Sequence, residues 1–325
     1  GIVPLKKAII HKLKRDNQFD YELNQIIASV GVKSGLYNLA QVILNPGDEA
    51  IIPAPYWVSY PPIVKLAGAK PVIITTHYDQ RFKITAEQLA AAITPKTRLL
   101  MINSPNNPSG MAYTKDELNA LSEVLLKHPN VLIAADDIYE YIFWGAGGFV
   151  NILNVCPELA ERTIIFNGLS KAYAMTGWRV GYAAGPVGII TAMKKIQSQS
   201  ITCVNAIAQV AAATALNADR SHFDYMLAAF KERHDVVHHA LNAMQGVNCL
   251  KSDGTFYLLP DVSAVIQRLG MKSDIELATH LLNKAHVATV PGTAFGSPGH
   301  IRISIATSLE KLNEAMARIA PICDE

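Results

Sequence analysis

The chain has 325 residues, of which 50% are hydrophobic and 17% are charged, so it can bury a large core and a smaller second one. Its 29 Lys and Arg residues against 27 Asp and Glu leave a formal net charge of +2 without a dense basic run, which makes nucleic acid a poor candidate partner. No apolar run approaches the roughly 20 residues that a membrane-spanning helix needs, and no signal peptide opens the chain. We therefore expect a cytoplasmic protein that acts on small molecules.

The cysteines and the first residues refine this expectation. The four scattered cysteines form no C-x-x-C pair and no zinc pattern, which favours buried free thiols in a reducing cytosol. The sequence begins at Gly1 without a methionine and runs directly into an amphipathic pattern that contains Pro4. We interpret residue 1 as an interior position of a longer natural chain.

Short apolar runs rich in β-branched residues alternate with longer helical patterns in the first part of the chain. Such alternation predicts an α/β fold with a mostly parallel, seven-stranded sheet flanked by helices, and ligands bind such sheets at the carboxyl ends of the strands. The runs are 26–30, 49–53, 71–75, 99–103, 131–135, 163–166 and 180–184.

The pattern changes beyond about residue 206. Residues 206–244 have helical periodicity, and the segments 254–259 and 300–306 have the alternation of strands in a smaller α+β unit. We therefore predict a large domain over residues 1–230 and a small C-terminal domain over residues 231–325.

Two segments with candidate functional side chains follow predicted strands. In Asn103–Gly110, two prolines and a glycine fix a rigid turn that holds Asn107 at the end of a strand, although an ordinary turn has the same composition. Asp136 and Tyr139 follow the run 131–135. In a cofactor with a pyridinium ring, an aspartate can keep the ring nitrogen protonated and a phenol can bind the 3-oxygen of the ring. Alternatively, Asp136 could be a helix N-cap, or the two residues could be a pair of magnesium ligands.

A third segment places Lys171 and Arg179 eight residues apart, after the run 163–166. An unprotonated lysine can attack an aldehyde, which burial and nearby cations favour, and the fork of an arginine suits a phosphate dianion. A lysine taken alone is usually a solvated surface charge, so Lys171 gains weight only from its neighbours.

Nearer the start, the run 26–30 leads into a loop predicted over Gly31–Gly35 and then into a helical segment, which together would form an anion cup. A plain connection is the commoner reading of such a turn. Trp57 could stack on a flat ring, although most tryptophans pack in a core.

Taken together, these residues resemble the class I aminotransferases of pyridoxal-phosphate fold type I, and within them the bacterial aspartate aminotransferase-like subgroup. The resemblance spans essentially the whole chain and rests on Ser104–Gly110, on Asp136 with Tyr139, and on Ser170–Arg179, in this order. It implies a transferase of fold type I that uses pyridoxal 5'-phosphate, acts on amino acids and 2-oxo acids, and pairs as a homodimer.

The resemblance also implies a role for each matching residue. Lys171 would hold the cofactor covalently and then move a proton between the substrate and the cofactor. Asp136 would pair with the ring nitrogen and Trp57 would stack on the ring. The 3-oxygen would be bound by Asn107 and Tyr139, and the phosphate by Arg179 with the backbone amides of Val32 and Lys33.

The substrate follows from two further residues. Arg302 lies in a segment that resembles the family's final strand and would bind the substrate α-carboxylate, with Trp57 and Asn107 beside it; an exposed strand arginine is the alternative. Lys33 stands where the aspartate-using subgroup has the partner of the distal carboxylate. The expected reaction is therefore aspartate plus 2-oxoglutarate to oxaloacetate plus glutamate.

Several alternatives stay open at this point. The same scaffold could act on aromatic substrates or prephenate, could catalyse a β-elimination, a decarboxylation or a cyclopropane-forming synthase reaction, or could be a non-catalytic sensor domain. The family's N-terminal arm has no counterpart in this sequence, because Gly1 aligns after it.

His234 and His238 have a spacing that can hold a metal, but a solvated helix face is favoured and we predict no metal site.

Overall fold

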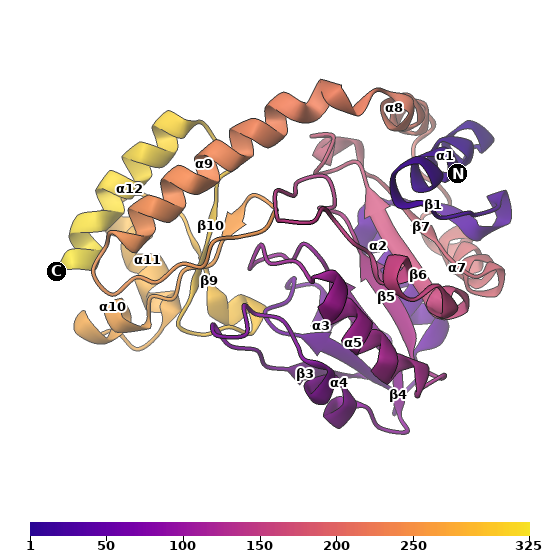
Figure 1. Ribbon diagram of the computed structural model, residues 1–325, viewed down its shortest axis with the longest axis horizontal. Helices are drawn as coiled ribbons and strands as arrows, with labels where there is room; N and C mark the ends of the chain where they lie inside the picture. Colours follow the sequence, from indigo (N-terminus) through magenta and orange to yellow (C-terminus); the bar gives the residue numbers. More distant parts are fainter.

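The structure is a computed structural model that describes residues 1–325. Its main feature is a seven-stranded sheet in the order β1-β7-β6-β5-β4-β2-β3 (Figure 1). The pairs among β2 to β6 are parallel, whereas β7 runs antiparallel to both of its neighbours, β1 and β6. The strands are β1 (Ile26–Val30), β2 (Glu49–Pro53), β3 (Lys70–Ile74), β4 (Thr97–Asn103), β5 (Leu132–Asp136), β6 (Thr163–Gly168) and β7 (Val180–Ala184).

The predicted α/β fold with a mostly parallel, seven-stranded sheet is confirmed. The predicted runs coincide with β1, β2 and β7, and the other four strands differ from their runs by no more than two residues at an end. One of these small differences matters for the site, because β5 includes Asp136 as its last residue.

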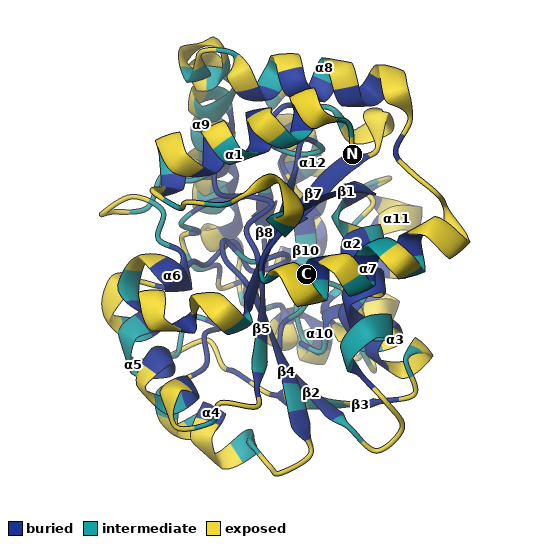
Figure 2. Ribbon diagram, turned by 90° about the vertical axis from the view of Figure 1, so that its right-hand side faces the viewer, coloured by how far each residue is buried: buried dark blue, intermediate teal, exposed yellow.

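Helices cover both faces of this sheet, and Figure 2 shows the buried strands between mostly exposed helices. One face packs against α2, α3 and α7, and the other against α4, α5 and α6, with α1 and α8 over its β1 and β7 end. These helices are α1 (Val3–Asn17), α2 (Gly31–Ile43), α3 (Tyr60–Leu66), α4 (Ala86–Ala92), α5 (Lys115–Leu126), α6 (Ile152–Val155), α7 (Val187–Ser200) and α8 (Ala206–Asn217).

Local sequence signals explain where several of these helices begin. The side chains of Thr85 and Thr114 accept hydrogen bonds from the backbone amides of Gln88 and Glu117, whose own side chains accept from the backbone amides of the threonines. Each capping box satisfies two backbone N–H groups that the first turn of a helix leaves free, so α4 and α5 start at defined residues.

The long helix α9 (Asp224–Asn242) leads from the large sheet to the C-terminal elements (Figure 1). There a three-stranded antiparallel sheet in the order β8-β10-β9 packs with α9, α11 and α12 around a separate core. The elements are β8 (Tyr257–Leu258), β9 (Val290–Pro291), β10 (Ile301–Ser304), α10 (Ser263–Arg268), α11 (Asp274–Lys284) and α12 (Leu309–Asp324).

This region differs from the sequence-based expectation in two details. Strand β9 was not predicted, because two residues carry no alternation. The predicted boundary between residues 230 and 231 falls inside α9, which is continuous across it. The division into a large and a small domain therefore stays a prediction.

Three further expectations need correction. His234 does not lie on a solvated helix face: it is fully buried, and its Nε2 accepts a hydrogen bond from the backbone amide of Ser252 at 3.1 Å. The predicted loop over Gly31–Gly35 is wrong, because α2 begins at Gly31 itself. Cys203 is exposed, whereas the other three cysteines are buried, and all four are free thiols.

Two whole-chain observations bear on function. None of the helices combines the length and the apolar character that crossing a bilayer requires. No group of three or more His, Cys, Asp or Glu side chains gathers in a way that could hold a metal ion.

Candidate active site

A cavity of about 420 Å³ opens at the carboxyl edge of the large sheet. It is lined by 18 residues, among them residues of both sheets and of the helices and loops around them. All nine residues that the sequence singled out are among them: Val32, Lys33, Trp57, Asn107, Asp136, Tyr139, Lys171, Arg179 and Arg302. The structure thus brings together residues that are up to 270 positions apart, from Val32 to Arg302.

The direction of the strands explains this gathering. Asn103 and Asp136 end the neighbouring parallel strands β4 and β5 and lie opposite each other in register. Lys171 follows the end of β6. Arg179 precedes β7, and because β7 runs antiparallel to β6, its first residue lies at the same edge as the last residue of β6.

Asp136 occupies a buried position with two hydrogen-bond donors. The hydroxyl of Tyr60 donates to Oδ2 at 2.6 Å and the backbone amide of Ile138 donates to Oδ1 at 3.3 Å. Burial raises the pKa of Asp136 to about 6, although Tyr60, the Ile138 amide and the charge of Lys171 each lower it. A protonated ring nitrogen placed in the cavity beside this carboxyl would favour its ionised form.

Lys171 lies in an environment that favours its neutral amine. Burial is the largest cause that lowers its pKa, followed by the positive charges of Arg302 and Arg179, whereas Asp136 opposes them. Its Nζ lies 5.4 Å from the centre of the Phe256 ring. A lysine with a lowered pKa keeps more of the unprotonated form that attacks a carbonyl carbon.

Arg302 has contacts with a polar side chain and with two aromatic rings, and one of its nitrogens has no partner. Its Nη1 donates to Asn107 Oδ1 at 2.9 Å, and its guanidinium carbon lies 4.3 Å from the centre of the Tyr257 ring and 4.8 Å from that of Phe295. Its Nε is buried and has no hydrogen-bond partner. Because buried donors are almost always paired, this nitrogen is suited to a carboxylate that enters the cavity.

Another part of the cavity can bind an anion. The first turn of α2 contains Val32 and Lys33, and the backbone amides of a first helical turn have no partner within the helix. A Cβ at Gly31, which has a φ of +70°, would lie 2.5 Å from Nη2 of Arg179, so the glycine allows the arginine to approach the helix start. This arrangement suits a phosphate dianion.

Trp57, Lys33 and Tyr139 line the remaining walls. Nζ of Lys33 lies 4.9 Å from the centre of the Trp57 ring. The hydroxyl of Tyr139 lies 3.5 Å from that of Tyr257, and burial, followed by the charge of Tyr257, raises the pKa of Tyr139 well above its ordinary value. Tyr139 is therefore a neutral phenol at physiological pH and can donate a hydrogen bond.

Other lining residues were not selected from the sequence. Tyr60 lies in the segment that contains Trp57, but nothing local indicates that its hydroxyl reaches Asp136. Asn103 ends β4 and donates to the carbonyl oxygen of Asp136 at 2.8 Å, while its own Oδ1 accepts from the Asn107 amide at 2.8 Å. A polar residue at the end of an apolar strand was the available signal for Asn103.

The donor set of the cavity fits pyridoxal phosphate. It offers an amine for an aldehyde, a carboxyl for a ring nitrogen, neutral hydrogen-bonding groups for a hydroxyl, and a helix start with an arginine for a phosphate. The buried, unpaired Nε of Arg302 leaves a donor for a substrate as well. The mixed sheet with this cavity at its carboxyl edge is the architecture of the fold type I transferases.

Comparison with known proteins agrees with this class. The family model described as "Aminotransferase class I and II" matches residues 1–319, and the chain belongs to this family. It is 52% identical to an aspartate/prephenate aminotransferase of Nitrosomonas europaea, covering 99% of this chain and 83% of that protein. It is 48% identical to an aspartate aminotransferase of Bacillus sp. YM-2, covering 98% of this chain and 81% of that protein.

Solved structures agree as well. The aspartate aminotransferase of Rhizobium meliloti superposes with a TM-score of 0.96 at 44% identity, and the match covers 100% of this chain and 82% of that one. The aspartate aminotransferase of Thermus thermophilus with maleate gives a TM-score of 0.93 at 39% identity over 99% of this chain and 82% of that one.

Proposed function

We propose that this protein transfers the amino group of aspartate to 2-oxoglutarate, with pyridoxal 5'-phosphate held covalently by Lys171. The observation that carries the proposal is the presence of two cations, Arg302 and Lys33, in the same cavity as Lys171 and Asp136. An amino acid with two carboxylates needs one cationic partner for each. The names of the relatives support this substrate class.

The cofactor would be held by the side chains described above. Arg179 and the first-turn amides of α2 would bind its phosphate, Asp136 would face its ring nitrogen, and Trp57 would lie against its ring. Once bound, it supplies an electron sink that stabilises negative charge on the substrate carbon. Asp136 contributes by staying ionised, which keeps the ring nitrogen protonated.

Lys171 then has a second task. With its Nζ free, Lys171 would be an amine whose pKa is lowered by burial and by the positive charges of Arg302 and Arg179. A neutral amine beside the substrate can accept a proton from the α-carbon and return it to a different atom. Arg302 orients the substrate for this transfer through its α-carboxylate.

A second candidate activity is transamination of aromatic amino acids or prephenate. The relative from Nitrosomonas europaea is named for both aspartate and prephenate, which supports this candidate. The wall of the cavity also includes aromatic rings, Trp57, Tyr257 and Phe295, that could accommodate an apolar side chain.

We further propose that the chain forms a homodimer, as the resemblance implies. Exposed apolar side chains beside the cavity support this: Trp178 and Ile207 line a surface hollow to which Arg179 also contributes. The free thiols support a reducing compartment such as the cytoplasm. Light scattering of the purified protein measures the oligomeric state, and a monomer at micromolar concentration would contradict the dimer.

The transamination itself is tested with purified, cofactor-loaded protein. Aspartate and 2-oxoglutarate should yield oxaloacetate and glutamate, each detected by a coupled assay or by mass spectrometry. Phenylalanine as amino donor and prephenate as amino acceptor are assayed in parallel, which tests the second candidate activity. Formation of no amino acid from any of these pairs would overturn the proposal.

A further inference from the structure

The turn Ser252–Gly254, between α9 and β8, makes close backbone contacts with segments at the edge of the large sheet. The amides of Asp253 and Gly254 both donate to the carbonyl oxygen of Gly110, at 2.9 and 3.0 Å. The carbonyl oxygen of Asp253 accepts from the amides of Trp144 and Gly145, both at 2.9 Å. One turn is thus bonded to two separate segments, which follow β4 and β5.

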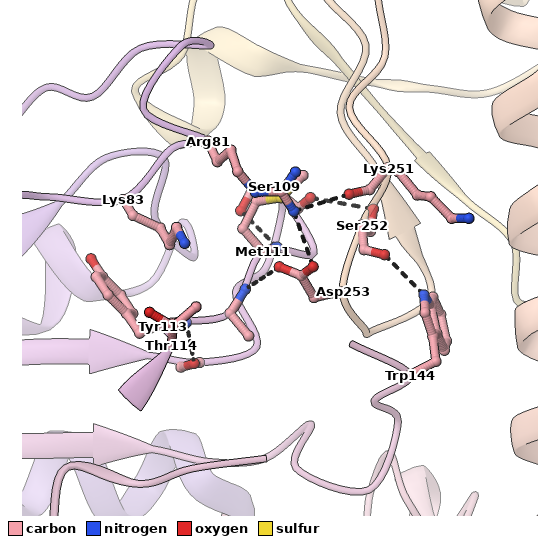
Figure 3. A network of polar contacts seen from close by, with 12 residues as sticks. Arg81, Lys83, Ser109, Met111, Tyr113, Thr114, Trp144, Lys251, Ser252 and Asp253 are labelled. Atoms are coloured by element: carbon pink, nitrogen blue, oxygen red, sulfur yellow. Dashed lines mark hydrogen bonds and ion pairs between the residues drawn. The ribbon is translucent and has the colours of Figure 1, made fainter. Parts of the chain in front are cut away.

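The side chain of Asp253 strengthens the same junction (Figure 3). Its Oδ2 accepts from the backbone amide of Ala112 at 3.0 Å, and its Oδ1 pairs with Nη2 of Arg81 at 3.0 Å. Ala112 is buried, so without this carboxylate its amide would lose its acceptor away from water. The carboxylate therefore joins the turn to the segments 77–83 and 104–112.

Glycines allow the two backbones to approach this closely. A Cβ at Gly110, which has a φ of +72°, would lie 2.6 Å from Cβ of Ser252. A Cβ at Gly254 would lie 2.4 Å from the carbonyl oxygen of Ile142. The junction is thus tightly packed on both of its sides, and a change in its geometry would move the attached segments.

These attached segments carry the two residues that meet in the cavity. Gly110 ends the turn that contains Asn107. Strand β8 follows Gly254 and pairs with β10, in which Arg302 lies. Arg302 donates to Asn107 at 2.9 Å. The two segments are therefore connected at two places: by Arg302 and Asn107 inside the cavity, and by Asp253 and its partners outside it.

We propose that Asp253 is a positioning residue that fixes the spacing between Arg302 and Asn107 for the substrate α-carboxylate, an inference that rests on the proposed function. A carboxylate that binds Arg302 through its unpaired Nε adds to the hydrogen bond between Arg302 and Asn107, so both residues must stay in place as it enters. The junction made by Asp253 outside the cavity keeps the Asn107 turn beside β10. Asp253 itself does not line the cavity.

The test compares Asp253→Ala with a matched control, Asp48→Ala. Asp48 accepts a hydrogen bond from the backbone amide of Asn45 at 2.8 Å and forms an ion pair with Arg98 at 3.5 Å. It therefore makes the same two kinds of contact as Asp253. The arginine side chains Arg98 and Arg81 are both 40% exposed. Asp48 precedes β2 and therefore lies at the sheet edge opposite to the cavity.

Three quantities are measured on the cofactor-loaded proteins: kcat and KM for aspartate, the dissociation constant of succinate by calorimetry, and the thermal midpoint. Both variants should lose stability. The loss of a hydrogen bond between Arg302 and the substrate carboxylate costs about ten- to hundredfold in affinity, so we expect Asp253→Ala to raise KM and the succinate dissociation constant by about that factor. Asp48→Ala should leave both within about twofold, because Asp48 lies at the sheet edge opposite to the cavity.

Equal constants for the two variants would overturn the inference. If Asp253→Ala does not fold, two milder variants replace it: Asp253→Asn and Arg81→Gln remove the ion pair and retain an acceptor for the Ala112 amide. Each should raise KM about two- to fivefold. An unchanged KM in both variants would overturn the inference. If the unmodified protein neither transaminates aspartate nor binds succinate, it is the proposed function that fails, so the two failures are distinguishable.

Discussion

Replacement of Tyr60 by phenylalanine tests how the cavity keeps Asp136 ionised. The hydroxyl of Tyr60 donates to Oδ2 of Asp136 at 2.6 Å and lowers the pKa of this carboxyl, which is about 6. Tyr60→Phe removes the donor and retains the ring. We therefore expect a higher pKa for Asp136 and weaker binding of pyridoxal phosphate near neutral pH, where the ring nitrogen needs an ionised partner.

The size of the effect follows from the strength of the lost bond. A hydrogen bond to a charged group contributes roughly 1.5 to 3 kcal/mol, which corresponds to about one to two pKa units. The pKa of Asp136 would then rise from about 6 to about 7 or 8. At pH 7 the ionised fraction would fall from about nine-tenths to between about one-half and one-tenth, so cofactor affinity should drop about two- to tenfold.

The assay is a titration of cofactor-free protein with pyridoxal phosphate at pH 7 and at pH 9. The loss should be present at pH 7 and largely absent at pH 9, where Asp136 is ionised in both proteins. Tyr113→Phe is the matched control, because Tyr113 is also buried but its hydroxyl accepts from the Ile84 amide instead of contacting a carboxylate. An affinity ratio for Tyr60→Phe that does not change with pH would refute the reasoning.

Three more predictions follow from other contacts. Lys33→Ala should reduce kcat/KM for aspartate about ten- to hundredfold and leave phenylalanine unaffected; equal losses in steady-state assays would contradict the role of Lys33. Lys12→Met should lower the free energy of unfolding in urea by about 3 to 5 kcal/mol, because it leaves the charge of the buried Glu140 without its ion-pair partner. The double variant Lys12→Met with Glu140→Leu should recover most of this stability. Because burial raises the pKa of Asp136 to about 6 in the folded state, its protonation stabilises the cofactor-free protein fully below about pH 4, and this contribution is lost as the pH rises through about 6. Asp136→Asn should remove that part of the pH dependence of urea unfolding, and an identical pH dependence in both proteins would contradict the pKa assignment.

The large sheet could be predicted from the sequence because buried parallel strands appear as continuous apolar runs between glycines and prolines. The same reasoning failed where the local signal is absent or ambiguous. Strand β9 has only two residues, and Gly31, which indicated a loop, is instead the first residue of a helix with a positive φ. His234 has polar neighbours along α9, but the turn at Ser252 covers it.

The sequence predicted that these nine residues gather in one place, but it did not predict their contacts. The strand order places Asn107, Asp136 and Lys171 at one edge, so topology alone brings them together. The contacts of Tyr60 with Asp136 and of Arg302 with Asn107 join residues 76 and 195 positions apart. No local pattern encodes such pairs, because they depend on how α3 and the C-terminal sheet pack against the large sheet.

The central claim is that Lys171 is the amine that binds the cofactor aldehyde. Borohydride reduction of the protein with pyridoxal phosphate, followed by digestion and peptide mass spectrometry, makes the linkage permanent and locates it. We expect the added mass on the peptide that contains Lys171, and its loss in Lys171→Ala. Stoichiometric label on another lysine such as Lys33, with Lys171 unmodified, would contradict the account.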